Sequence, residues 1–384
     1  MLMEKGEYES RVDNSLEECS AVFVALKKLG IVEGEEYWMS QADFSYIGRG
    51  EELFFHGGKI SPTSLENYFS CPFGHFAERG LKLKPREEAV VLATDSGDLV
   101  HRLLEITAKR AKEFSTEEAL RSFAYDTCKA LMENSAYRMQ QDTDVGSYAT
   151  ERMLLEAVDV AAAAYRHIVN STFEVEATER LVESDLFRGK VDRVDGTEKY
   201  VRIVDYKTGA ITATPTAYYT GQKIQMELYM SEIKGERIPA GVFYFPASLS
   251  YVGKEDAEGR FRMAGFINGE EEALLAGDNN IQDKAKSEYF EASLKENGRL
   301  SKVMDEKTFV DFLDYAVLVA RKGCQELKEG YIAPSPYEKG CEYCKYGGMC
   351  GFNREVAQTR SESAISPTTI ANIVRREKEE GQED

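Results

Sequence analysis

An aspartate and a lysine stand two positions apart in the segment VRIVDYKTG. Asp205 and Lys207 share one face of a predicted strand, because side chains at i and i+2 of a strand point the same way. Asp192 lies among apolar residues of the preceding predicted strand. Two carboxylates on neighbouring strands repel each other unless a cation joins them, and oxygen ligands suit Mg²⁺ or Mn²⁺. The alternative is an Asp–Lys ion pair that only holds two strands together.

Further polar residues fit the same chemistry. A bound divalent ion polarises a phosphoryl oxygen, and a nearby lysine orients the attacking water or stabilises developing charge. Gln225 and Tyr229 share one face of the predicted helix 219–234 and can hydrogen-bond phosphate or sugar oxygens, while Tyr229 can also stack on a base. His101, on the predicted helix 96–114, would complete a His/Asp/Asp site. An ordinary amphipathic helix and a boundary histidine are the alternatives.

Four cysteines form a second group. Cys341, Cys344 and Cys350 follow a C-x2-C-x5-C spacing, and Cys71 is the best-placed fourth thiolate. Four thiolates suit a 4Fe–4S cluster or Zn²⁺, and the spacing favours neither; free cysteines in a loop are the alternative. A metal cross-link between Cys71 and Cys341, which are 270 residues apart, would stabilise the fold by about 5 kcal/mol in a loop-entropy model.

Composition limits the class of protein. The chain has 384 residues, 42% hydrophobic, and a formal net charge of −19, which argues against a nucleic-acid binder that relies on a global positive field. No run of apolar residues is long enough for a membrane-spanning helix, and the start shows no secretory signal. The odd cysteine count then favours a reducing, cytoplasmic location.

The hydrophobic periodicity changes along the chain from helical to strand-like and back. It predicts an α/β core decorated with helices. Asp195 is interpreted as a turn residue beside Gly196. The predicted helices are 15–29, a run beginning at Ser61, 96–114, much of 116–170, 219–234, 283–299 and 307–328, and the predicted strands are 173–183, 186–196, 199–209 and 240–246.

The order and spacing of these motifs resemble the PD-(D/E)XK nucleases of the RecB-like group. Within that group they resemble the C-terminal nuclease domain of AddB-type helicase–nuclease subunits. The resemblance is carried by SPTSLENYFSCPFGHF, GDLVHRLLE, GKVDRVD, VDYKTG, QMELY and CEYCKYGGMCGF.

The resemblance implies a restriction-endonuclease-like α/β fold: a central mixed sheet flanked by helices, with a helical insertion at about 115–170 and an iron–sulfur staple. It also implies three segments. Residues 1–52 would be an N-terminal helical segment, either the tail of a helicase-like region or the start of a short homologue. Residues 53–355 would form the nuclease domain, and 356–384 a polar, flexible tail.

The resemblance also assigns roles. His101, Asp192, Asp205 and the backbone carbonyl of Tyr206 would bind Mg²⁺ or Mn²⁺, and Lys207 would assist the attacking water. Gln225 and Tyr229 would position the DNA strand. The 4Fe–4S ligands would be Cys71, Cys341, Cys344 and Cys350.

The implied activity is a metal-dependent exonuclease that cuts mainly single-stranded DNA, with an AddA-like helicase partner, during double-strand break repair and recombination. The chain has no GxxxxGK[ST] loop for ATP. Its acidic charge predicts weak DNA binding by the chain alone, so that a partner would deliver the strand. Two alternatives are a standalone nuclease, like the CRISPR-associated iron–sulfur exonucleases, and an inactive DNA-binding scaffold.

Overall fold

The structure is a computed structural model. It describes residues 45–84, 93–133, 144–248, 259–284, 286–294, 302–338, 340–342, 344–352 and 359–380. The predicted helix 15–29 lies outside the described residues, as does most of the segment 1–52. Within the described ranges, none of the helices has the length and apolar character needed to cross a membrane.

Six strands form one mixed sheet with the order β1-β2-β3-β4-β5-β6. The β3–β4 and β5–β6 pairs are parallel and the other neighbours are antiparallel. The sheet therefore confirms the predicted mixed α/β core, and the first four strands lie where the sequence predicts them. The strands are β1 (Glu174–Glu183), β2 (Arg188–Gly196), β3 (Tyr200–Lys207), β4 (Ile238–Pro246), β5 (Ala264–Asn268) and β6 (Val303–Met304).

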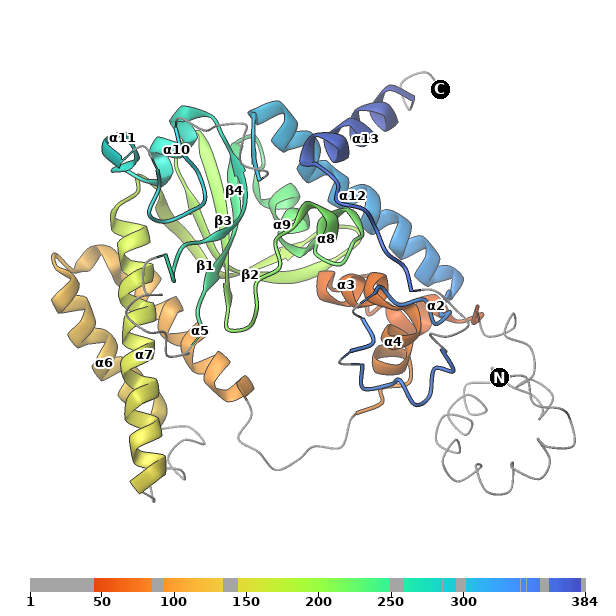
Figure 1. Ribbon diagram of the computed structural model, residues 1–384, viewed down its shortest axis with the longest axis horizontal. Coiled ribbons are helices and arrows are strands. Elements are labelled where there is room, and N and C mark those ends of the chain that lie inside the picture. Colours follow the sequence, from red (N-terminus) through yellow and green to blue (C-terminus); the bar gives the residue numbers. More distant parts are fainter. Residues whose placement is uncertain are drawn as a thin grey trace, which may run out of the picture.

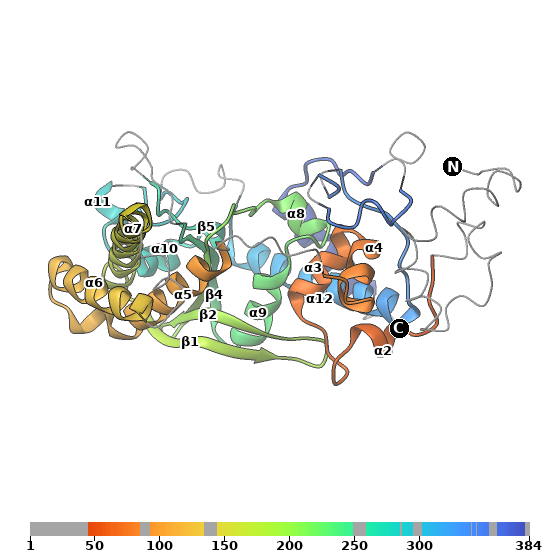
Figure 2. The ribbon, with the colours of Figure 1, turned by 90° about the horizontal axis from the view of Figure 1, so that it is seen from below.

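Helices cover both faces of the sheet (Figures 1 and 2). One layer comprises α5 (Ala93–Arg110), η4 (Ala111–Glu113), α6 (Glu117–Glu133), α7 (Asp144–Val169), α10 (Glu271–Gly277) and α11 (Ile281–Lys284). The other comprises α2 (Gly50–Phe54), α3 (Pro62–Ser70), α4 (Pro72–His75), η3 (Phe76–Gly80), α8 (Pro215–Tyr219), α9 (Gln225–Ile233), α12 (Glu306–Glu329) and α13 (Pro367–Glu380). Helices α6 and α7 occupy the stretch predicted as a helical insertion.

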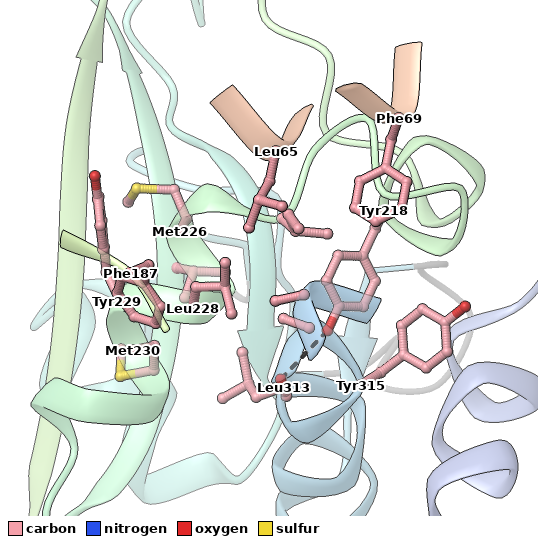
Figure 3. Close-up of a cluster of buried hydrophobic side chains, with 14 of the residues drawn as sticks. Leu65, Phe69, Phe187, Tyr218, Met226, Leu228, Tyr229, Met230, Leu313 and Tyr315 are labelled. Atoms are coloured by element: carbon pink, nitrogen blue, oxygen red, sulfur yellow. Dashed lines mark hydrogen bonds between the residues drawn. The ribbon is translucent and has the colours of Figure 1, made fainter. Parts of the chain in front are cut away.

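Strand β3 is buried on both sides, so its side chains divide between two cores. Val201 and Ile203 join the core with α3, α9 and α12, whereas Val204 and Tyr206 join the core with α5 and α7. Figure 3 shows a cluster of buried side chains from the first core. There the Tyr218 hydroxyl donates a hydrogen bond of 2.5 Å to the Phe312 carbonyl of α12. This bond joins α8 to α12.

The predicted helix 219–234 starts too early: α8 already ends at Tyr219, and α9 begins only at Gln225. Gly221 has a left-handed φ of +77°, which glycine adopts without a steric penalty, and it ends the helical path between them. The side chain of Phe69 fills the space that a Cβ on Gly221 would need. The break makes Gln225 the first residue of α9.

Two C-terminal predictions differ from the structure. The predicted helix 283–299 is replaced by the short α11 and a turn, in which the Ser287 hydroxyl donates to the Asp278 carboxylate at 2.8 Å; residues 295–299 lie outside the described ranges. The segment 356–384, expected to be a flexible tail, contains α13. This helix buries Ile370 and Val374 and places the Arg375 guanidinium 2.7 Å from Asp311 on α12. Its narrow apolar stripe is easily missed among charged residues.

Asp195 is not a turn residue, and this prediction is wrong. It belongs to β2, is 1% exposed and pairs across the strands with Arg202 of β3. Its Oδ2 accepts a hydrogen bond of 2.9 Å from Arg202 Nε, and its Oδ1 lies 3.0 Å from Arg193 Nε. Arg202 also donates to the Ser171 hydroxyl at 3.2 Å. One buried carboxylate thus serves two buried guanidinium groups.

Candidate metal-binding and catalytic site

The two predicted carboxylates come together on neighbouring strands. Arg193 of β2 pairs with Val204 of β3, and the next positions along the two strands are Asp192 and Asp205. Both side chains are buried. The backbone N–H of Tyr206 donates a hydrogen bond of 2.6 Å to Asp192 Oδ2, which fixes that carboxylate against β3. The strand pairing therefore creates the repulsive carboxylate pair that the sequence predicts.

The environment of Asp192 disfavours its charge. Burial, and next the neighbouring Asp205 carboxylate, raise the pKa of Asp192 to about 6; Glu179 adds to the rise, while His101 and the Tyr206 N–H oppose it. A divalent cation would reverse this balance, because it attracts both carboxylates and replaces their lost hydration. The donor set of carboxylate oxygens and one imidazole suits such an ion.

His101 and Lys207 flank the carboxylates. His101 projects from α5, and its Nδ1 lies 3.5 Å from Asp192 Oδ2. The Lys207 ammonium lies 2.5 Å from Asp205 Oδ2 and is 34% exposed, so it faces the solvent side of the pair. The structure thus places Asp192, Asp205, His101 and Lys207 around one point where three elements meet: β2, the end of β3 and helix α5.

One acidic neighbour was not predicted from the sequence. Among the described residues, His101, Glu179 and Asp192 each offer a ligand atom, and these three atoms lie within 4.8 Å of one another. Asp205 does not belong to that group. The ligand atoms of the predicted set, His101, Asp192 and Asp205, therefore do not all lie within 4.8 Å of one another in this structure. Glu179 lies on β1 among many other charged residues, and nothing in the local sequence marks it as a metal ligand. Only the strand pairing brings it to the site.

Gln225 and Tyr229 lie together on α9, one turn apart. The Gln225 amide donates to the Tyr229 hydroxyl at 3.3 Å. Gln225 also lines a small pocket together with Tyr244 and the predicted catalytic lysine, Lys207. The Tyr229 ring is 2% exposed and packs near Phe187 (Figure 3), so in this conformation it contacts Gln225 rather than offering a face for stacking.

Glu66 holds the start of α9 and was also missed from the sequence. Its Oε1 accepts hydrogen bonds of 2.9 Å from the backbone N–H groups of both Ile224 and Gln225. These N–H groups have no partner inside the helix, and a carboxylate is favoured at a helix N-terminus. Glu66 lies in the middle of α3, and Cys71 caps the C-terminus of this helix. Helix α3 therefore links the cysteine region to the position of Gln225.

The four predicted cysteine ligands are half-buried free thiols in the structure. Cys71 stands between α3 and α4, and the C-terminal loop lies beside these helices (Figures 1 and 2). The Tyr337 N–H donates to the Ser70 carbonyl at 3.2 Å, and the Arg360 guanidinium donates to the Phe69 carbonyl at 2.6 Å. Burial, with a smaller contribution from Cys344, raises the pKa of Cys71. These contacts hold the chain on both sides of the cysteine loop beside the end of α3. In the part of the chain that the structure describes, no three of the four thiols lie within 4.8 Å of one another.

One protein family matches most of this chain. A family model described as the PD-(D/E)XK nuclease superfamily matches residues 59–351. That range includes β1 to β6, the residues around Asp192 and Asp205, and all four cysteines.

Curated relatives share one description, the B-type component of an ATP-dependent helicase/deoxyribonuclease. The protein from Lachnoclostridium phytofermentans is 25% identical over 363 residues, which cover 83% of this chain and 32% of that protein. The protein from Clostridium kluyveri is 25% identical over 86% of this chain and 33% of its own length. The protein from Bacillus subtilis is 25% identical over 83% and 32%, respectively. The chain spans about a third of the length of these relatives.

Proposed function

Because the chain belongs to the PD-(D/E)XK nuclease superfamily, we propose that it hydrolyses phosphodiester bonds of DNA with Mg²⁺ or Mn²⁺. Its proposed substrate is single-stranded DNA, and its mode is exonucleolytic. The observation that carries the proposal is the juxtaposition of Asp192, Asp205 and Lys207 at one end of β3, with His101 beside them.

The residues present fit a divalent metal. The raised pKa of Asp192 reflects two carboxylates that repel each other in a buried place, and such a pair is stabilised by a shared cation. We propose that Asp192, Asp205, His101 and the Tyr206 carbonyl hold it. When bound, the metal would polarise the scissile phosphate and lower the pKa of its water.

The side chains of the protein then have separate tasks. Lys207 projects beyond Asp205 and can donate a hydrogen bond to the attacking water or to a phosphate oxygen, which stabilises the charge that develops in the transition state. Gln225, at the start of α9, can donate its amide to the sugar–phosphate backbone near Lys207. Tyr229 and Glu66 keep that amide in place, through the contacts described above.

We further propose that the chain acts as the nuclease part of a helicase–nuclease in double-strand break repair and recombination. The relatives are described as components of an ATP-dependent helicase/deoxyribonuclease, and an AddA-like partner would supply the strand. The net charge of −19 supports delivery by a partner, because an acidic protein attracts DNA weakly.

A nuclease assay tests the proposal. The purified chain is incubated with end-labelled single-stranded and duplex oligonucleotides in Mg²⁺, Mn²⁺ or EDTA. We expect stepwise shortening of single strands in either metal, none in EDTA, and none with Asp205→Asn. The exposed Asp185, in the turn between β1 and β2, gives the matched control Asp185→Asn, which should cut like the unchanged chain. Binding of single strands without any cleavage in either metal would instead favour a DNA-binding scaffold.

For the four cysteines we propose a 4Fe–4S cluster that fastens the C-terminal loop to α3. The support is that all four thiols are free and half-buried, and that the backbone contacts of Tyr337 and Arg360 hold the C-terminal segment beside the end of α3. Four thiolates are the usual ligands of such a cluster.

Anaerobic purification tests the cluster. We expect a brown protein with about four irons per chain, and loss of both colour and iron in Cys344→Ser. Cys324→Ser, at a buried cysteine of α12 that lies outside the group, should keep its iron. A colourless protein with one zinc per chain would contradict the iron–sulfur proposal.

A further inference from the structure

Glu179 occupies an unusual place at the edge of the site. On β1, Thr178 pairs with Arg193 and Arg180 pairs with Val191, which places Glu179 opposite Asp192. With Asp205 on β3, the three carboxylates form a row across three neighbouring strands. The Glu179 side chain is 26% exposed, so it lies at the solvent side of the row.

The backbone conformation at Glu179 is one that favours glycine over glutamate. Its φ is +54°, a left-handed conformation that glycine adopts easily and that costs other residues of the order of 1 kcal/mol. The chain nevertheless places a carboxylate there, and its oxygen is one of three ligand atoms within 4.8 Å, together with those of His101 and Asp192. The imidazole and the buried Asp192 give this group a donor set that suits a cation.

We infer that Glu179 is a further ligand of the metal site, which it would approach from the side opposite Asp205. The inference rests on the proposed metal-dependent function and deepens it. In the structure the carboxylate of Glu179 forms an ion pair with Lys190, two residues before Asp192, and this contact raises the pKa of Lys190. Lys190 therefore competes with the metal for Glu179.

The test is the affinity for Mn²⁺, measured by isothermal titration calorimetry without DNA. We expect Glu179→Gln to weaken Mn²⁺ binding at least tenfold. Glu179→Gly removes the same carboxylate while suiting the left-handed backbone, so it should lose affinity equally and remain folded. The control is Glu183→Gln, on the same strand but paired with Lys59, which should bind Mn²⁺ like the unchanged chain.

Lys190→Gln separates the metal role from a structural ion pair. If Glu179 is a ligand, removing its competitor leaves the Mn²⁺ affinity unchanged or higher. If Glu179 acts only through Lys190, then Lys190→Gln and Glu179→Gln lose affinity alike, and the inference is overturned. It is also overturned if both Glu179 variants bind Mn²⁺ normally. Failure of the unchanged chain to bind Mn²⁺ would instead overturn the proposed metal-dependent function.

Discussion

Replacing Lys207 with alanine is expected to lower the rate of DNA cleavage about a thousandfold while the protein stays folded. The reason is position. The ammonium lies 2.5 Å from Asp205, and the side chain is partly exposed, so this positive group stands next to the buried carboxylates and can meet an incoming phosphate. Losing it removes charge stabilisation that is needed only in the transition state, so kcat should fall far more than the affinity for Mn²⁺.

A matched control lies at the other end of the same strand. Lys199 immediately precedes β3, is exposed and pairs with Glu272, so Lys199→Ala should leave both cleavage and metal affinity unchanged. Single-turnover cleavage of a labelled single strand and calorimetry with Mn²⁺ give the two readouts. If Lys207→Ala cleaved the single strand at more than a tenth of the normal rate, the proposal that this lysine is catalytic would be wrong.

The largest effect on stability is expected at Asp195. Asp195→Asn should lower the free energy of unfolding by about 3 to 5 kcal/mol, because it leaves the buried guanidinium groups of Arg193 and Arg202 without their charge partner. Both arginine side chains are almost completely buried, so water cannot replace the lost carboxylate.

Urea unfolding of the metal-free protein measures this loss. Asp185→Asn serves again as the control, since a substitution at an exposed turn changes stability by about 0.5 kcal/mol or less. A loss below about 1 kcal/mol for Asp195→Asn would mean that the two arginines do not depend on this carboxylate. The proposed catalytic residues lie outside this charge cluster, so Asp195→Asn that remains folded should still bind Mn²⁺.

The sequence predicted the residues whose spacing matches a local period. Asp205 and Lys207 are two apart on a strand, and Gln225 and Tyr229 are four apart on a helix, so each pair shares a face whatever the rest of the chain does. The mixed sheet flanked by helices was likewise predictable, and both the strand order and the family match confirm it. The resemblance to AddB-type subunits is confirmed by the relatives found.

What the sequence could not predict depends on contacts between distant segments. Glu66 reaches the start of α9 across 158 positions, and its neighbours give no sign of that task. Glu179 becomes a neighbour of Asp192 only through the register of β1 on β2. Asp195 looks like a turn residue because glycine follows it, yet the strand continues through it. In each case the partner, rather than the local pattern, determines the role.

The contact between α3 and the C-terminal loop has a consequence for the order of events during synthesis. Arg360 and Phe69, which hold these segments together, are 291 residues apart in the chain. A ribosome adding about 5 to 20 residues per second needs roughly 15 to 60 s to bridge that distance. Throughout this interval Cys71 has emerged without the loop that carries the other three thiols. The contact between α3 and the C-terminal loop therefore forms last, after the strands that carry the proposed catalytic residues have already left the ribosome.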